Sequence, residues 1–135
     1  MACLDTTVLL DLVGKSGRRR RVDAEAKLRQ LDHDRPHSVT RFTLAELLVG
    51  VELSDDPARE RDALRPLLAR LQTLEFEARA TGLYAAIFVH LRAIGRLPGT
   101  MDLLIASVAL AHGQRLVTRN ARHYQDVRGL RVDDY

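Results

Sequence analysis

The chain has 135 residues, 46% of them hydrophobic and 29% charged, which suits one domain, residues 1–135, with a real buried core. Its single cysteine, Cys3, excludes an intramolecular disulfide and a zinc site built on cysteines. The sequence contains no signal-peptide pattern and no apolar run near the roughly 20 residues that cross a bilayer. We therefore expect a cytoplasmic protein that does not engage a membrane.

The charge is modest but unusual in kind. The formal net charge is +3, and all 21 basic residues except Lys15 and Lys27 are arginines. Arginine pairs well with phosphate oxygens, although a preference of the source genome for arginine codons would give the same composition. Four adjacent arginines are more informative, because neighbouring cations repel one another and gain from an anionic partner. We predict a phosphate-contacting loop, with a merely solvated loop as the alternative, at Arg18, Arg19, Arg20 and Arg21.

In the first third of the chain, the sequence predicts a strand followed by a helix twice. Residues 1–4 form a short apolar run that ends at Asp5, and Thr6 can cap a helix to about residue 12. A polar stretch, 14–21, precedes a predicted helix over 22–34, which Pro36 ends before a short strand at 38–40. Thr43 and Glu46 then have the spacing of a capping box at the start of the next helix.

The rest of the chain continues the alternation. Helical spacing of apolar residues predicts helices from 57 to about 71, from 77 to about 94 and from 101 to 112, with Gly113 as the last terminator. Strands are predicted at 73–76 and 115–118, and a fifth short strand at 130–132. Strands that alternate with helices indicate an α/β fold with a mainly parallel sheet of four to five strands, covered on both faces.

Three acids, Asp5, Glu46 and Asp102, each lie where a strand should lead into a helix, and Asn120 follows the fourth strand. In an open α/β sheet such positions share one edge, so these side chains can converge. Clustered carboxylates repel one another unless a cation neutralises them, and oxygen ligands suit Mg²⁺ or Mn²⁺. Each residue also has a structural interpretation, because acids, amides and capping-box glutamates are ordinary at helix starts.

Four motifs in order resemble those of PIN-domain ribonucleases, and among them the VapC toxins of bacterial toxin-antitoxin pairs. The resemblance covers nearly the whole chain. Each motif is weak alone, and their order and spacing carry the likeness. They are Leu-Asp-Thr-Thr-Val-Leu at 4–9, Thr-Leu-Ala-Glu-Leu at 43–47 with Gly-Val-Glu at 50–52, Met-Asp-Leu-Leu-Ile-Ala at 101–106, and Leu-Val-Thr-Arg-Asn at 116–120.

The resemblance implies a three-layer α/β/α sandwich and an endoribonuclease that depends on Mg²⁺, with Mn²⁺ as a substitute. Asp5, Glu46 and Asp102 match the metal-binding catalytic acids, Asn120 matches a fourth catalytic position, and Thr6 matches a hydroxyl that lines the pocket. The acids would hold a metal-activated water that hydrolyses an RNA phosphodiester bond. The resemblance further implies a homodimer that is inhibited by a cognate VapB-type antitoxin.

Two positions depart from the family pattern. Asn120 stands where aspartate is frequent, so it offers a neutral oxygen and should weaken occupancy of a second metal. Thr100 stands where an auxiliary acid is frequent, and we place it among the pocket-lining residues. Neither change removes the three acids.

Further residues near the fourth motif are candidates for contacts with RNA. Arg119 and Arg122 flank Asn120 and could steer phosphate, with a surface role as the alternative, and His123 is close enough in sequence to approach the acids.

Rival functions are less well supported. A haloacid-dehalogenase site would need a second aspartate two residues after Asp5, where this chain has Thr7. A response-regulator receiver would need a lysine late in the chain, and no lysine follows Lys27. The more serious alternative is a PIN-like module that binds RNA or an antitoxin without cleavage.

Overall fold

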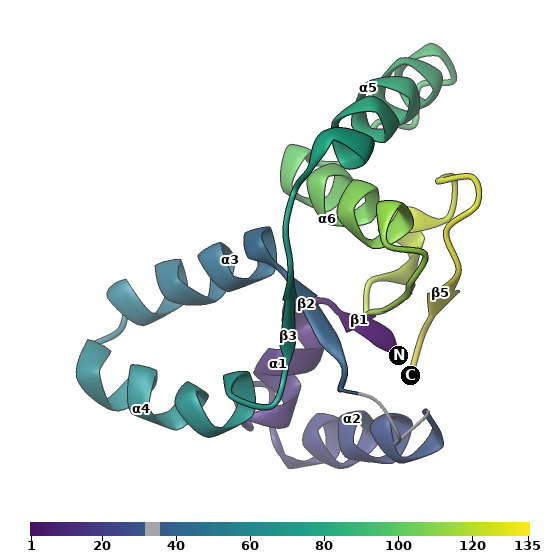
Figure 1. Cartoon of the computed structure of the whole chain (residues 1–135). Helices are drawn as coiled ribbons and strands as arrows, with labels where there is room; N and C mark the ends of the chain where they lie inside the picture. Colours follow the sequence, from purple (N-terminus) through teal and green to yellow (C-terminus); the bar gives the residue numbers. More distant parts are fainter. Residues whose placement is uncertain (32–35) are drawn as a thin grey trace.

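The computed structural model describes residues 1–31 and 36–135. Short strands alternate with helices through most of the chain (Figure 1). The elements are β1 (Ala2–Leu4), α1 (Thr6–Leu12), α2 (Arg18–Gln30), β2 (Ser38–Thr40), α3 (Arg41–Glu52), α4 (Pro57–Leu68), β3 (Gln72–Leu74), α5 (Ala78–Ala93), α6 (Thr100–Ala111), β4 (Arg115–Val117), the 3₁₀ turn η1 (Ala121–Tyr124) and β5 (Val132–Asp133).

The five strands form one sheet in the order β3-β2-β1-β4-β5, and every neighbouring pair is parallel. Cys3 of β1 pairs with Ser38 on one side and with Leu116 on the other, so β1 is the central strand. Parallel neighbours need crossover connections, and the intervening helices supply them. The predicted α/β class with a parallel sheet is confirmed.

Two hydrophobic cores lie on opposite faces of this sheet, because side chains alternate along each strand. Cys3 and Leu116 belong to the core under α5 and α6, together with Leu103. Leu4 and Val117 belong to the other core, which is completed by residues of α1, α3 and α4. The sheet is therefore covered on both faces, as a three-layer arrangement requires.

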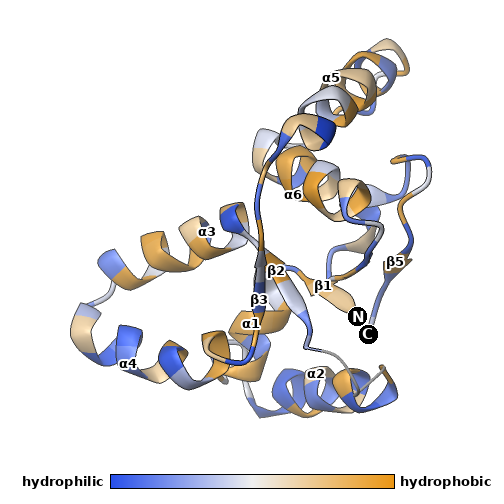
Figure 2. Cartoon of the chain, viewed as in Figure 1, coloured by the Kyte–Doolittle hydropathy of each residue, from blue (hydrophilic) through white to orange (hydrophobic). Residues whose placement is uncertain are grey.

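Hydropathy explains which helix lies where. Figure 2 shows α6 as largely hydrophobic and α2 as largely hydrophilic. Six residues of α6 between Leu103 and Ala109 are buried, whereas Ala24 is the one buried residue within α2. Helix α6 packs against α5 and the sheet, and α2 covers α1 from outside. Gly113, with φ of 65°, takes the left-handed conformation that ends α6 as predicted.

The structure corrects three local predictions. Asp5, and not Thr6, caps α1, because its side chain accepts the Thr6 backbone N–H. Helix α2 begins at Arg18, so the four arginines form its exposed first turn and not a loop; predicted helical positions 32–34 lie outside the described residues. Helix α3 is capped by the Thr40 side chain, which accepts the backbone N–H of Thr43 at 3.0 Å. Thr43 is thus inside the helix, and Glu46 is free of a capping role.

Among residues 1–31 and 36–135, no helix combines the length and the apolar character needed to span a membrane.

Candidate carboxylate site

The site lies at the carboxyl ends of the central strands. Asp5 directly follows β1, and Thr118 directly follows the neighbouring β4. The chain leaves β1 towards β2 on one side, while β4 lies on the other side, so the strand order reverses between β1 and β4. In open α/β sheets this reversal opens a crevice in which ligands bind.

The Asp5 carboxylate accepts a short hydrogen bond on each of its two oxygens. One carboxylate oxygen accepts the backbone N–H of Thr6 at 2.8 Å and so caps α1, and the other accepts the Thr118 hydroxyl at 2.7 Å. The side chain is nearly buried, with 5% of its surface exposed. Burial raises the pKa of Asp5, the hydrogen bonds from Thr118 and Thr6 oppose that rise, and the charge of Asp102 adds to it.

Tyr124 connects Asp5 with Asp102. Its hydroxyl lies 3.4 Å from Asp5 Oδ2 and 3.2 Å from Asp102 Oδ1. These two carboxylate oxygens are therefore no more than about 6.6 Å apart, the sum of both distances. Burial and the nearby acids raise the pKa of Tyr124, so its hydroxyl keeps its proton and acts as a donor.

Glu46 reaches the same place from α3. Its Oε1 accepts the Thr6 hydroxyl at 2.7 Å, so Thr6 contacts Asp5 through its backbone and Glu46 through its side chain. Burial raises the pKa of Glu46, and the charges of Asp5 and Asp102 raise it further. The three predicted acids thus converge: Thr6 joins Asp5 to Glu46, and Tyr124 joins Asp5 to Asp102.

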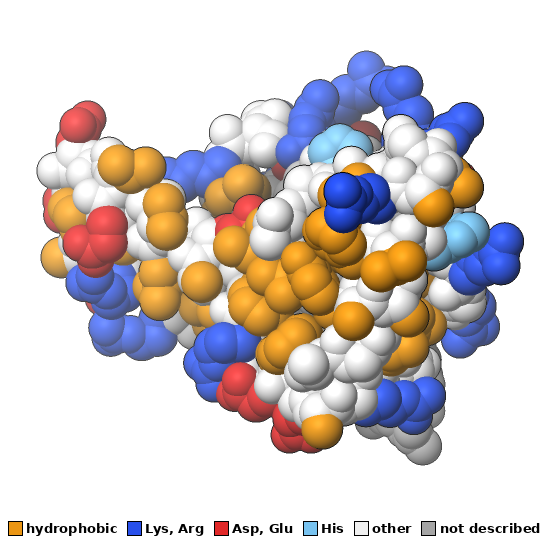
Figure 3. Space-filling model, turned by 90° about the horizontal axis from the view of Figure 1, so that it is seen from above, with side chains coloured by type: hydrophobic (Ala, Val, Ile, Leu, Met, Phe, Trp, Pro, Cys, Tyr) orange, Lys and Arg blue, Asp and Glu red, His pale blue; other side chains and the backbone are white. Residues whose placement is uncertain are grey.

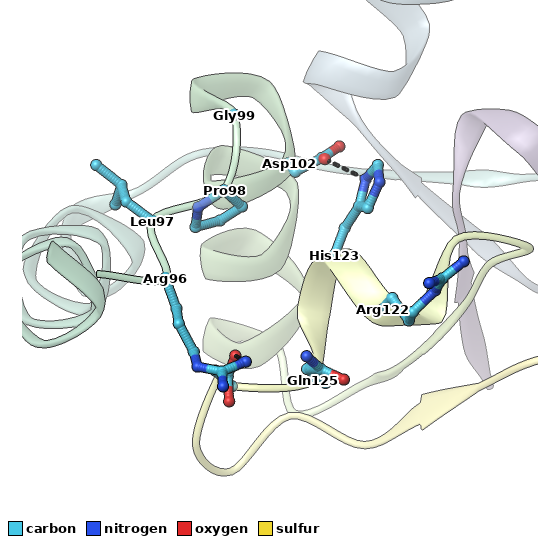
Figure 4. Close-up of a pocket in the computed structure, with 9 residues that line it drawn as sticks. Arg96, Leu97, Pro98, Gly99, Asp102, Arg122, His123 and Gln125 are labelled. Atoms are coloured by element: carbon cyan, nitrogen blue, oxygen red, sulfur yellow. Dashed lines mark hydrogen bonds and ion pairs between the residues drawn. The ribbon is translucent and has the colours of Figure 1, made fainter. Parts of the chain in front are cut away.

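Asp102 lies in the first turn of α6, where the helix dipole favours a negative charge. Its second oxygen, Oδ2, is 2.8 Å from Nδ1 of His123 (Figure 4). His123 is more than half exposed, at 54%, so this contact forms at the mouth of the site and not in its interior. The sequence singled out His123 only for its proximity to Asn120.

The donor set suits a hard divalent cation. Every side-chain oxygen of Asp5 and Asp102, and one of Glu46, is already oriented by a protein donor, which is how metal ligands are usually held in place. Within the described ranges no three His, Cys, Asp or Glu side chains stand close enough to chelate one ion together. Mg²⁺ fits such an open arrangement, because it usually binds one or two carboxylates and keeps several waters.

The other predicted site residues occupy different places. Asn120 is exposed at the start of η1, where its backbone N–H donates to the Thr118 hydroxyl at 3.0 Å while its side chain makes no capping bond. Thr100 is exposed at the first position of α6 and lines neither of the two hollows described below. Thr6 lies in the site, between Asp5 and Glu46.

Arg119 points away from the acids into a second buried network. Its Nε is 3.1 Å from Oδ2 of Asp11, which is fully buried and also accepts the Tyr135 hydroxyl at 2.7 Å. The Nε–H of Arg119 is not aligned for a hydrogen bond, so the contact with Asp11 is an ion pair. The predicted phosphate contact of Arg119 therefore finds no support in its geometry, because its guanidinium already serves Asp11.

The arginine run lies apart from the acids. Arg18 to Arg21 line neither hollow, and Arg21 forms an exposed ion pair with Glu25. Arg122, in contrast, is exposed on η1 beside the carboxylates.

Sequence reasoning missed two functional side chains, Thr118 and Tyr124. Thr118 was inside the fourth motif, but no local pattern indicated that its hydroxyl would contact Asp5 across 113 positions. Tyr124 follows the predicted strand by a turn whose path no periodic pattern defines. The available signal was a large aromatic residue in a polar segment. Such a residue tends to be buried, and a buried tyrosine hydroxyl usually has a hydrogen-bond partner.

Two hollows flank the acids. The first, here called the Asp102 hollow, has a volume of about 370 Å³ and is lined by Arg96, Asp102, Arg122, His123 and Gln125 among others (Figure 4). The second, the Glu46 hollow, has a volume of about 540 Å³ and lies between α1, α3 and α4. Its lining includes Thr6 and Glu46 at the carboxylate end and the apolar Leu47, Val51 and Leu64.

Comparison with known proteins places this geometry in a family. Residues 2–130 match the family described as PIN domain. The chain is 33% identical over 97 residues to the tRNA(fMet)-specific endonuclease VapC of Shigella flexneri, covering 72% of this chain and 74% of that protein. It is 32% identical over 98 residues to ribonuclease VapC2 of Rickettsia felis, covering 73% of each.

Solved structures of VapBC complexes have the same fold. VapBC2 from Rickettsia felis bound to a DNA fragment from their promoter superposes with a TM-score of 0.87 at 27% identity, over 98% of this chain and 97% of that one. VapBC-1 from nontypeable Haemophilus influenzae gives a TM-score of 0.85 at 27% identity, over 98% and 96%. The fold and its carboxylate edge thus define a PIN domain. The chain belongs to the PIN-domain family and, within it, to the VapC group.

Proposed function

We propose that the protein is a metal-dependent endoribonuclease, the toxin of a VapBC-type toxin-antitoxin pair. The observation that carries the proposal is the convergence of Asp5, Glu46 and Asp102 at the carboxyl edge of the sheet, where Thr6 links Asp5 to Glu46 and Tyr124 links Asp5 to Asp102. The names of the relatives, ribonuclease and endonuclease, support the same activity.

Asp5, Asp102 and Glu46 would hold the ion, either directly or through its waters. When bound there, Mg²⁺ or Mn²⁺ supplies an activated water and neutralises the charge that develops on the attacked phosphate. The chain's own residues set the geometry. Thr118 and the Thr6 backbone fix Asp5, the Thr6 hydroxyl fixes Glu46, and Tyr124 spans Asp5 and Asp102.

The arrangement also explains why an ion should be retained. Burial and mutual repulsion raise the pKa of both Asp5 and Glu46, so their charged forms are unfavourable until a cation offsets them. A bound proton or a bound metal ion relieves this repulsion. Asn120, one charge less negative than an aspartate, does not add to the repulsion, and we expect it to orient a water, the substrate or a weakly held second ion.

The test is cleavage of RNA by the purified protein with Mg²⁺, with Mn²⁺ and with chelator. The tRNA(fMet) named for the Shigella relative is one substrate to try, beside total RNA. We expect metal-dependent cuts that disappear in Asp5→Asn and Asp102→Asn, both of which keep a side chain of the same size. An Asp62→Asn variant removes a charge from an exposed position on α4 that lines neither hollow, and it should cleave normally.

Cleavage that persists undiminished in Asp5→Asn or Asp102→Asn would refute the assignment. Absence of cleavage by folded protein with either metal would favour a PIN-like module that binds RNA or an antitoxin without cutting.

We also infer a VapB-type antitoxin as the partner, because the superposed solved structures are VapBC complexes. The Glu46 hollow suits a segment of such a partner, since its apolar lining leads directly to Thr6 and Glu46. Titration with a cognate VapB-type protein should inhibit cleavage, and undiminished cleavage at saturation would contradict this inference.

A homodimer is a further expectation. On α3, Val51 is buried in the core, whereas Leu48 is 47% exposed. On α5, Val89 is 66% exposed, and Figure 3 shows hydrophobic side chains gathered on the face that carries α5 and α6. The mass in solution, measured by light scattering, tests the dimer: twice the 15.2 kDa chain mass supports it and a monomeric mass refutes it.

A further inference from the structure

The Asp102 hollow contains cationic groups that the carboxylates do not use. Arg122 lies on its wall, and across the part of the chain that the structure describes its guanidinium forms neither a hydrogen bond nor an ion pair. Arg96 forms an ion pair with Asp126, at 3.6 Å, and its side chain is 59% exposed. Exposed pairs of this kind contribute little, so Arg96 can exchange Asp126 for a stronger anion.

The two acids in the hollow do not cancel these cations. Asp126 is the partner that Arg96 can leave, and Asp102 is engaged by Tyr124 and His123. Asp102 is also one of the acids proposed to hold the divalent ion, which would offset its charge. An anion that enters the hollow is therefore attracted by Arg122 and Arg96, beside the acids proposed to cleave the phosphodiester bond.

The remaining lining suits a base. The amide of Gln125 offers both donors and an acceptor, as base edges do. Pro98 provides apolar surface, and the exposed His123 ring provides an aromatic face of the kind on which unpaired RNA bases stack (Figure 4). A volume of about 370 Å³ is near the lower end of ligand pockets and accommodates one nucleotide, not a duplex.

From these observations we propose that the Asp102 hollow binds one unpaired nucleotide of the RNA strand next to the bond that is cleaved. Arg122 and Arg96 hold its phosphate, and Gln125, Pro98 and His123 contact its base. The proposal rests on the proposed ribonuclease function and adds a subsite to it. It also implies that the strand crosses the carboxylates from one hollow to the other, with the nucleotide in the Asp102 hollow splayed out of any helix.

The direct test uses a probe that the enzyme cannot cleave. Adenosine, guanosine, cytidine and uridine 5′-monophosphates and inorganic phosphate are titrated separately into ¹⁵N-labelled full-length protein with Mg²⁺ present. We expect saturable shifts at the amides of Gly99, Gln125 and Asp126, and at least one nucleotide should bind several-fold more tightly than inorganic phosphate. Shifts confined to other surfaces, or equal affinity for phosphate and all four nucleotides, would overturn the proposal.

Matched variants locate the contacts. Arg122→Ala and Arg96→Ala should each weaken nucleotide binding roughly ten-fold, as expected for loss of a charge-assisted phosphate contact. Arg79→Ala removes the same charge from an exposed site on α5 that lines neither hollow, and should bind as the unaltered protein does. Equal losses in all three variants would indicate attraction by net charge alone and would overturn the assignment.

The design separates this proposal from the nuclease proposal. Nucleotide binding in the hollow without RNA cleavage would refute the nuclease and leave the subsite in place. Metal-dependent cleavage without shifts in the hollow would do the reverse.

Discussion

The repulsion between Asp5 and Asp102 predicts that the metal-free protein becomes more stable when Asp5 is neutralised. Their nearest linked oxygens are at most about 6.6 Å apart. At an effective dielectric constant of about 20, two unit charges at that distance repel by about 2.5 kcal/mol. Asp5→Asn removes this repulsion but also weakens the hydrogen bonds that Asp5 accepts, which are stronger for a charged acceptor.

We therefore expect a net gain in the free energy of unfolding of about 1–2 kcal/mol, or roughly 3–6 °C in Tm for a chain of this size. Asparagine is also a good helix N-cap, so the cap of α1 should survive. The measurement is thermal unfolding at pH 7.5, with chelator and with Mg²⁺. Mg²⁺ should stabilise the unaltered protein, by about 2.7 kcal/mol at one hundred times its Kd, and should leave Asp5→Asn unaffected.

A less stable Asp5→Asn in chelator would show that the hydrogen bonds of Asp5 outweigh the repulsion, and the reasoning would fail. Asp62→Asn is the matched control, because Asp62 is exposed on α4 and its loss should change the Tm by little.

Three further predictions concern pH, metal affinity and stability. Since burial raises the folded-state pKa of Asp5 and Glu46, the stability that these groups contribute is present below their unfolded pKa and is lost as pH rises through the folded values. Urea midpoints in chelator should therefore fall between pH 4.5 and 7.5, and they should fall less in Asp5→Asn. Tyr124→Phe should weaken Mn²⁺ binding by roughly 10- to 100-fold in calorimetric titration, because the hydroxyl orients both ligands. Arg119→Ala should lower the free energy of unfolding by about 3 kcal/mol, since it leaves the buried Asp11 charge without a counterion.

The metal-affinity and stability predictions each have a control variant, and the pH prediction has a contradicting outcome. Tyr84→Phe removes a hydroxyl away from the carboxylates, so an equal loss of affinity there would contradict the role of Tyr124. Arg122→Ala removes an exposed arginine and should shift stability by no more than about 0.5 kcal/mol. A flat urea midpoint across the pH range would contradict the raised pKa values.

Most of the architecture was accessible from periodicity. The strand at Ser38–Thr40 has the predicted bounds and the first helix ends at Leu12 as predicted, because a proline and a short apolar run define them locally. The cap of that helix was misplaced by one residue, since aspartate and threonine are both good N-caps. The start of α2 was missed because repulsion among Arg18 to Arg21 argued for a loop, whereas arginine is itself a good helix former and Arg21 pairs with Glu25 one turn later.

The site was only partly accessible. Asp5, Glu46 and Asp102 could be predicted to converge, because the rule that places strand ends on one edge does not depend on side-chain detail. The roles of Thr118 and Tyr124 could not, since each depends on a contact between segments more than 20 positions apart. The inward turn of Arg119 was hidden for the same reason: nothing local indicates that Asp11 would be buried and need a counterion.

The division of the interior into two cores has a consequence for how activity responds to change. Asp102 is carried by α6, which packs in one core, and Glu46 is carried by α3, which packs in the other. Asp5 follows the strand between them. The distances among the three acids therefore depend on the positions of both helical layers relative to the sheet. A small shift of either layer can misalign the carboxylates without unfolding the protein.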